Sequence, residues 1–312
     1  MEDTSQAVPG ARGKVCCVAN LKGGVGKTTT AIMAAEGLSA QGLSVLVIDT
    51  DAQANFGWSF LGDDGLARAR EEGRTVDAFV SDRFLRGSRV TIEDCIHEGV
   101  STLYVMGRKT NGHANISLMP CTPRIIDLER RMLIELGKAG CAYPDAEAMV
   151  YKAFASVIDY ARSRFDWVVV DCAPGLNILT RSALGTADTI VVATVPEPLP
   201  VYGLETFLDV VWASHDPASG FPRPVPPNVL VTRFDSSQPE HRKQEEHIRR
   251  RRTDGPAYMV MRTVVPEMSY LKSQTFWGRT RRTFAEKYAG GTAKVAMRLA
   301  AEIQESVHDR AA

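Results

Sequence analysis

The amino-acid sequence predicts an α/β fold, with a mostly parallel twisted sheet and helices on both of its faces. Segments with strand character alternate with segments of helical spacing, which favours parallel strands joined by helical crossovers. Several strand segments are continuous apolar runs, such as residues 43–49, as is typical of strands buried on both faces. We therefore expect one domain over residues 14–312, preceded by a flexible polar tail of residues 1–13.

The individual elements follow from these patterns. Strands are predicted where short apolar runs occur, at residues 14–19, 43–49, 103–106, 116–119, 166–171, 188–194, 229–232 and 260–265. Helices are predicted where apolar residues recur at helical spacing, at residues 28–41, 125–136, 146–164 and 290–307, with a short helix over 75–85 and another beginning near Glu240. The polar stretch 62–100 is interpreted as an insertion on the sheet edge.

The composition is that of an ordinary globular protein, with 44% hydrophobic and 24% charged residues. The formal net charge is zero, so contact with nucleic acid would need a local basic patch. No run of 18 apolar residues occurs, and residues 1–13 are too polar for a signal peptide. The six cysteines form no C-x-x-C pair, so we expect free thiols in a reducing cytoplasm rather than a zinc site.

The most informative motif is the glycine-rich segment after the first expected strand. Residues 20–30 read Asn-Leu-Lys-Gly-Gly-Val-Gly-Lys-Thr-Thr-Thr, between a strand pattern and a helix pattern. This is the context of a phosphate-binding loop, in which Lys27 reaches the β and γ oxygens and the Thr28 hydroxyl holds Mg²⁺. The expected nucleotide contacts are Gly23, Gly24, Val25, Gly26, Lys27, Thr28 and Thr29.

The loop departs from the usual spacing, because Leu21 stands where glycine is expected and Lys22 precedes the two glycines. The form K-G-G-x-G-K-[ST] resembles the deviant Walker A motif of the ParA/MinD family of dimerising P-loop ATPases. The resemblance covers roughly residues 14–60 and 116–305. It implies a P-loop NTPase fold, ATP and Mg²⁺ as cofactors, and a homodimer that encloses the nucleotides. In that family the extra lysine reaches the partner's nucleotide, which implies a catalytic role in trans for Lys22.

Two acidic residues follow the second expected strand. The stretch Asp49-Thr-Asp-Ala-Gln-Ala-Asn55 resembles the family's D-x-D-P-Q-x-N, with Ala52 in place of proline. The resemblance implies that Asp51 orients or polarises the attacking water, and that Asp49 lies near Mg²⁺ and the phosphate loop. The alternative is an acidic residue that caps a turn at a strand end.

A third acidic residue, Asp171, ends a later strand after four apolar residues, which is the Walker B pattern. It would hold Mg²⁺ through water; a plain strand-end acid is the alternative. Gly175 resembles the family's switch glycine, although Ala173-Pro174 stands where the family has D-x-P-P.

Further segments resemble the base-binding and dimerising parts of the family. Val231-Thr-Arg-Phe-Asp235 resembles the strand end that borders the adenine, and Thr263-Val-Val-Pro266 resembles the purine-side loop. These resemblances imply nucleotide contacts for Arg233 and Pro266, whereas Glu267 stands where the family commonly has arginine. Pro196–Leu204 resembles a segment of the dimer interface.

Two arginine clusters are candidates for DNA binding. The first is Arg249, Arg250, Arg251 and Arg252, and the second is Arg279, Arg281 and Arg282. Arginines at a helix C-terminus also complement the helix dipole and can simply face solvent. The resemblance implies double-stranded DNA binding without sequence preference through basic residues, a mode that depends on salt.

The sequence is therefore interpreted as a ParA/Soj-type partition ATPase of the cytoplasm and nucleoid. ATP would drive dimerisation and DNA binding, slow hydrolysis would release the DNA, and a ParB-like partner would stimulate hydrolysis. One alternative is the same switch positioning a protein cargo on the nucleoid, such as a microcompartment or chemoreceptor cluster. A MinD-like membrane-cycling ATPase is less favoured, because residues 295–312 lack a bulky apolar face. A nitrogenase-reductase or dethiobiotin-synthase relative is disfavoured, because no paired cluster cysteines stand out.

Overall fold

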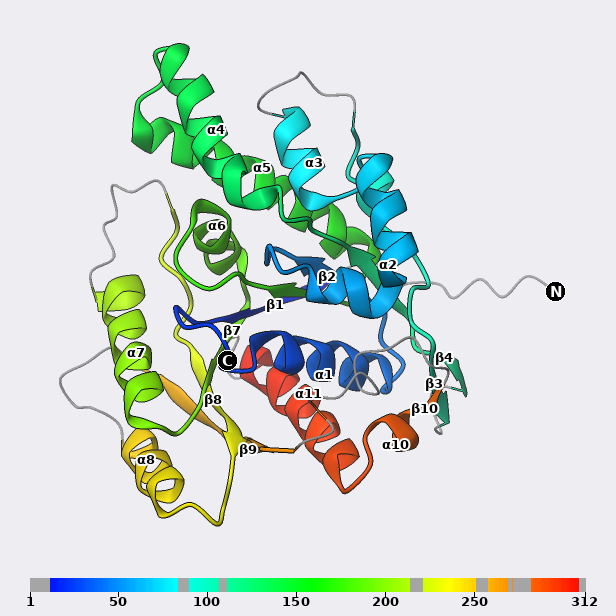
Figure 1. Ribbon diagram of the computed structural model, residues 1–312, viewed down its shortest axis with the longest axis vertical. Coiled ribbons are helices and arrows are strands. Elements are labelled where there is room, and N and C mark those ends of the chain that lie inside the picture. Colours follow the sequence, from blue (N-terminus) through cyan, green and yellow to red (C-terminus); the bar gives the residue numbers. More distant parts are fainter. Residues whose placement is uncertain are drawn as a thin grey trace.

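A parallel sheet lies at the centre of the molecule (Figure 1). The computed structural model describes residues 12–83, 90–106, 111–213, 221–250, 258–268, 271 and 282–308. The sheet has seven strands in the order β5 (Ile116–Met119), β2 (Val45–Asp49), β6 (Trp167–Asp171), β1 (Lys14–Ala19), β7 (Thr189–Thr194), β8 (Asn228–Phe234) and β9 (Met259–Pro266). All of its neighbouring strands pair in parallel. The predicted fold class is confirmed.

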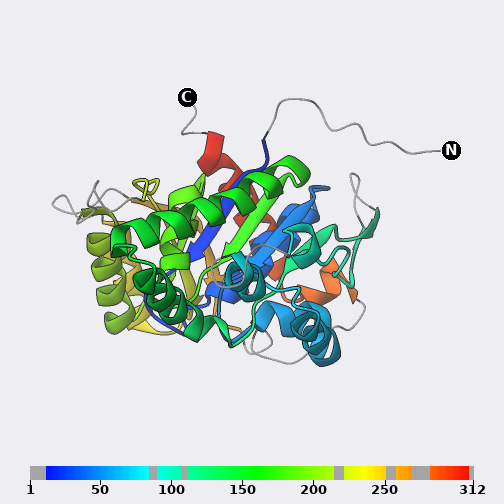
Figure 2. The same ribbon diagram turned by 90° about the horizontal axis from the view of Figure 1, so that it is seen from above.

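Helices cover both faces of this sheet, because alternate residues of the central strands enter different cores. Cys16 and Val18 of β1 pack toward α1 (Lys27–Ser39), α2 (Asn55–Glu71) and α11 (Thr292–His308). Val15 and Cys17 pack toward the helices of the opposite face, namely α3 (Val76–Ser81), α4 (Ile125–Lys138), α5 (Tyr143–Arg164), α6 (Ile178–Thr186) and α7 (Pro198–Leu208). In Figure 2, α5 lies in front of the strands and α11 behind them.

Helix α11 packs directly on α1, the helix that follows the glycine-rich loop (Figure 1). A Cβ at Gly37 of α1 would lie 2.6 Å from the carbonyl oxygen of Ala296, so only glycine permits this approach. Leu299, Ala300 and Ile303 of α11 are fully buried. The apolar face of this helix is therefore occupied within the fold.

Part of the stretch 62–100 lies at the edge of the sheet, and part of it contributes to the core. His97 forms a bridge with Leu118 of the edge strand β5. Its first residues continue helix α2 past a break at Gly62, where φ is 72°, and this helical extension was not predicted from the sequence. Val76, Phe79 and Val80 are buried in the same core as β6.

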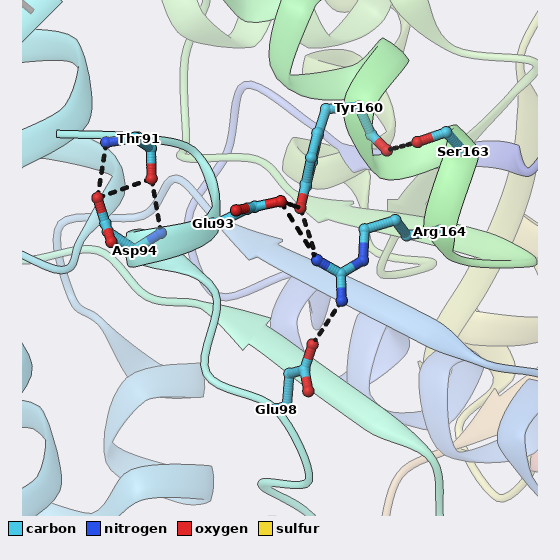
Figure 3. Close-up of polar contacts among 7 residues, drawn as sticks. All are labelled: Thr91, Glu93, Asp94, Glu98, Tyr160, Ser163 and Arg164. Atoms are coloured by element: carbon cyan, nitrogen blue, oxygen red, sulfur yellow. Dashed lines mark hydrogen bonds and ion pairs between the residues drawn. The ribbon is translucent and has the colours of Figure 1, made fainter.

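Figure 3 shows how residues 91–98 attach to α5. The Tyr160 hydroxyl donates to Glu93 Oε1 at 2.5 Å, and Arg164 donates to the Tyr160 oxygen at 2.6 Å. Arg164 also pairs with Glu98 at 3.0 Å. These exposed contacts tie the segment to the face of α5.

A second, small sheet lies beside the β5 edge. It consists of β10 (Arg282–Thr283), β3 (Leu103–Met106) and β4 (Asn111–His113). The strand predicted at 103–106 therefore exists, but it belongs to this sheet. Helix α10 (Phe284–Lys287) follows β10, whereas α8 (Pro239–Arg249) follows β8 near the opposite edge of the main sheet.

The strand order decides where the functional residues meet. Strand β1 lies between β6 and β7, and β6 also pairs with β2. The register aligns Asp171 with both Val18 and Asp49. The glycine-rich loop and the acidic residues that end β2 and β6 therefore share one edge, where ligands bind in open parallel sheets.

Candidate nucleotide-binding site

A pocket of about 460 Å³ opens at the carboxyl ends of the strands. Nine of the thirteen residues predicted to bind the nucleotide or Mg²⁺ or to act in catalysis lie in its wall: Gly23, Gly24, Gly26, Lys27, Thr28, Thr29, Asp51, Arg233 and Pro266. Several separate segments of the sequence therefore form one cavity, with the glycine-rich loop at one side and the ends of β8 and β9 at the other.

The glycine-rich loop has the backbone that a phosphate site requires. Gly24 and Gly26 adopt φ values of 75° and 84°, which non-glycine residues rarely adopt. Helix α1 begins at Lys27 directly after the loop, and no side chain caps its first turn. Its free N–H groups and positive dipole end therefore remain available to an anion.

Lys27 is buried beside the loop. Its ammonium donates to the Lys22 carbonyl oxygen at 2.8 Å. Burial lowers the pKa of Lys27, and the charges of Asp171 and Asp51 oppose that shift. Because the buried Lys27 ammonium is poorly hydrated, its attraction to a phosphate oxygen would be stronger than in water.

Two other residues of the loop do not line the pocket. The Lys22 side chain is exposed. The Val25 side chain is buried in a small cluster with Ala193 and Val195, so only its backbone can face a ligand. The Lys22 side chain therefore faces solvent rather than the pocket.

Asp49 and Asp171 lie under the pocket and are almost fully buried. Burial raises the pKa of Asp49 to about 7, although the N–H of Asp51 lowers it by hydrogen bonding. Burial and then the charge of Asp49 raise the pKa of Asp171 well above its usual range, and a hydrogen bond from the Thr28 side chain acts against this. Burial disfavours the ionised form of both carboxyl groups, and a cation bound beside them would favour that form.

Asp51 lies in the wall of the pocket, in a tight turn. Its N–H donates to Asp49 Oδ1 at 3.0 Å, and its own Oδ1 accepts the N–H of Gln53 at 3.0 Å. The turn continues through Ala54, whose φ of 50° is left-handed. This hydrogen bonding fixes a carboxylate at the mouth of the acidic cluster.

The other side of the pocket is built by β8 and β9. Arg233 pairs with Glu267 at 3.0 Å, and Val265, Met268 and Leu271 add apolar surface. Arg233 is one of two non-glycine residues with positive φ among those described. An apolar wall beside a phosphate loop suits the base and sugar of a nucleotide.

Sequence reasoning did not assign several wall residues, namely Thr30, Gln53, Asn55, Pro174, Thr232, Val265, Glu267, Met268 and Leu271. Some of them adjoin assigned residues, as Thr232 adjoins Arg233. Their position near the ends of predicted strands could have indicated them, but whether their side chains face the pocket depends on the tertiary fold.

The structure does not bring the described parts of the two arginine clusters together. Arg249 and Arg250 form ion pairs with Glu245 and Glu246 one turn earlier on α8. Arg282 lies on β10, at the other edge of the main sheet. Arg251, Arg252, Arg279 and Arg281 lie outside the described residues.

Comparisons with known proteins agree with this geometry. A model of the AAA domain family matches residues 13–217, more than half of the chain. The chromosome partitioning protein ParA of Caulobacter vibrioides is 27% identical over 300 residues, which cover 96% of this chain and 97% of the relative. The sporulation initiation inhibitor protein Soj of Bacillus subtilis is 26% identical over 199 residues, or 64% of this chain and 65% of Soj.

Solved structures show the same fold. A Cyanothece McdA variant in complex with ATP superposes with a TM-score of 0.65 at 18% identity, covering 96% of this chain and 98% of McdA. The structure of pNOB8 ParA bound to nonspecific DNA gives a TM-score of 0.62 at 19% identity, and the match covers 95% of this chain and 99% of that ParA chain. The chain therefore belongs to the AAA domain family of ParA-type ATPases.

Proposed function

We propose that this protein is an ATP-dependent dimerising partition ATPase. Its ATP state would bind double-stranded DNA without sequence preference, and hydrolysis would release it, so that plasmid or chromosomal DNA is segregated with a ParB-like partner. The observation that carries the proposal is the single pocket that joins the glycine-rich loop to Asp51, directly above the buried acids Asp49 and Asp171. In such an arrangement the glycine-rich loop would hold a triphosphate, and the acidic residues would lie near its γ-phosphate.

The residues under the pocket fit Mg²⁺. Among the residues that the structure describes, the buried oxygens Asp49 Oδ2 and Asp171 Oδ1 have no hydrogen-bond partner. Buried polar atoms require partners, and Mg²⁺ binds carboxylate oxygens together with water and phosphate. Thr28, Asp49 and Asp171 would hold the ion, directly or through water. When bound, Mg²⁺ would neutralise charge on the phosphate oxygens.

The protein's own groups then have separate tasks. Lys27 and the N-terminus of α1 bind the phosphates, and Asp51 positions the attacking water. Lys22 reaches the nucleotide of the second subunit. The apolar wall near Arg233 and Pro266 contacts the base.

Exposed side chains support a homodimer. Leu199 and Tyr202, three residues apart on α7, are 74% and 70% exposed. They lie in the segment that resembles the family's dimer interface, and residues three apart share one helix face. We propose that this face contacts a second copy when ATP is bound.

The described structure favours DNA over a membrane as the surface on which the protein cycles. The apolar face of α11 is buried against α1, so it offers no bulky membrane-binding face. No described helix is long and apolar enough to cross a membrane. DNA contacts would come from the proposed arginines, with a nucleoid location as the consequence.

The test is retention of the protein on random-sequence duplex DNA with ATP, ADP or no nucleotide, over a series of salt concentrations. We expect retention with ATP only, with a steep fall as salt rises, because Lys and Arg release counterions from DNA. Arg250→Ala should reduce the salt slope by about one unit if Arg250 contacts a phosphate. Arg130→Ala, at an exposed ion pair on α4, is the matched control. Absence of retention in every state would contradict the DNA-binding part of the proposal.

A further inference from the structure

The end of β8 contacts two successive carbonyl oxygens of the glycine-rich loop. Thr232 Oγ1 lies 2.7 Å from the Val25 carbonyl oxygen and 3.0 Å from that of Thr194. Arg233 donates from its guanidinium to the Gly24 carbonyl oxygen at 3.0 Å. Residues separated by about 207 positions in the sequence thus hold adjacent peptide groups of the loop.

These contacts have a consequence for the loop N–H groups. A trans peptide unit is planar, and its C=O and N–H point in opposite directions. Holding the Gly24 carbonyl therefore directs the Val25 N–H away from β8, and holding the Val25 carbonyl does the same for the Gly26 N–H. These N–H groups belong to the part of the loop that cradles phosphate.

Arg233 is itself held in place. Its Nε donates to Glu267 Oε2 at 3.0 Å, and the Glu267 N–H donates to the Phe234 carbonyl oxygen at 2.9 Å. The backbone of Arg233 is left-handed, with φ of 51°. A non-glycine residue persists in this conformation only where its surroundings fix it, often at a functional site.

We infer that Thr232 and Arg233 are positioning residues for the diphosphate part of the nucleotide, with Glu267 holding Arg233. They act through the backbone of the loop, by presetting the N–H groups of Val25 and Gly26 before the nucleotide arrives. This inference rests on the proposed function, and it gives Arg233 a task other than the adenine contact expected from the sequence. Preset donors lower the ordering cost of binding.

The two explanations for Glu267, repulsion of the nucleotide or positioning of Arg233, predict opposite changes in ATP affinity for Glu267→Gln. Removing a carboxylate near a triphosphate would strengthen ATP binding if only Coulomb repulsion mattered. Loss of the ion pair that holds Arg233 should weaken ATP binding, by about three-fold. Thr232→Val changes no charge and should weaken both ATP and ADP by about three- to ten-fold, whereas Thr232→Ser keeps the hydroxyl and should retain the affinity.

The experiment measures two quantities in the full chain. The first is the NMR order parameter of the Val25 and Gly26 amides without nucleotide, expected at about 0.85 and falling toward about 0.6 in Thr232→Val and Arg233→Ala. The second is the affinity for ATP, ADP and ITP, in which the ATP-to-ITP ratio should stay unchanged in Arg233→Ala. Arg242→Ala is the control, because Arg242 also donates to a backbone carbonyl, that of Ser236, outside the pocket.

Unchanged order parameters in Thr232→Val and Arg233→Ala, tighter ATP binding by Glu267→Gln, or a changed ATP-to-ITP ratio would each overturn the inference. A wild-type protein that binds no nucleotide would overturn the proposed function instead, while the order parameters would still decide the role of Thr232 and Arg233. Because Arg233 and Glu267 are partly exposed, their variants are expected to fold even if Thr232→Val does not.

Discussion

The two sides of the pocket differ in how far their charged side chains are buried and paired. Under the glycine-rich loop, Lys27, Asp49 and Asp171 are buried, and two carboxylate oxygens have no partner among the described residues. On the β8–β9 side, Arg233 and Glu267 are partly exposed and already paired. Buried charge without a partner is costly, whereas an exposed pair contributes little to stability. The first side is therefore built to receive a ligand, and the second to hold the loop.

The ion pair between Glu36 and Lys287 is largely buried but does not line the pocket, so it tests the effect of burial on stability apart from ligand binding. Lys287 Nζ donates to Glu36 Oε1 at 2.6 Å, and the Tyr288 hydroxyl donates to Glu36 Oε2 at 2.5 Å. Lys287→Met should lower the free energy of unfolding by about 3 kcal/mol, because it leaves the buried Glu36 charge under-compensated. Urea denaturation of both proteins measures the difference.

The control is Lys138→Met, which removes an exposed pair with Glu135 at the similar distance of 2.7 Å. Its effect should stay below about 1 kcal/mol. Equal losses in the two variants would show that burial does not distinguish the pairs.

Asp51, at the border between buried acids and open pocket, should affect turnover rather than folding. Asp51→Ala should lower ATP hydrolysis by about 100-fold while the ATP-bound dimer accumulates, because the water loses its positioning group. Phosphate release and sedimentation of the dimer measure the two effects. Asp63→Ala, at an exposed position of α2, is the control. Undiminished turnover in Asp51→Ala would remove Asp51 from catalysis.

Lys22 is the exposed charge of the loop, so its removal should have the smallest effect within one subunit. Lys22→Ala should leave the affinity of the monomer for ATP within about two-fold, yet weaken the ATP-dependent dimer by about ten-fold or more, because a charge-assisted contact is lost. Light scattering with ATP and with ADP measures the dimer. Lys152→Ala, exposed on α5, should dimerise normally. A Lys22→Ala protein that dimerises like the wild type would exclude the role in trans.

Local patterns were sufficient to predict much of the fold and the elements on either side of the glycine-rich loop. The strand, glycine loop and helix around Lys27 are contiguous, and Asp49 and Asp171 each end an apolar run that is typical of a buried strand. Helices α6 and α7 were not predicted from the sequence, because neither has a long amphipathic pattern. The strand at 103–106 was predicted, but its sheet could not be, because β10 lies far away in the sequence.

The sequence by itself determined where the glycine-rich loop lies and where β1, β2 and β6 end, because these features depend on residue type and on short-range periodicity. Only the tertiary structure decided which strand ends meet. The order β2-β6-β1 sets Asp49 beside Asp171, and the approach of β8 to the loop gives Thr232 its contact with Val25. Hydrogen bonds and unpaired buried charges depend on distances of a few ångströms between remote residues, and no local pattern encodes those distances.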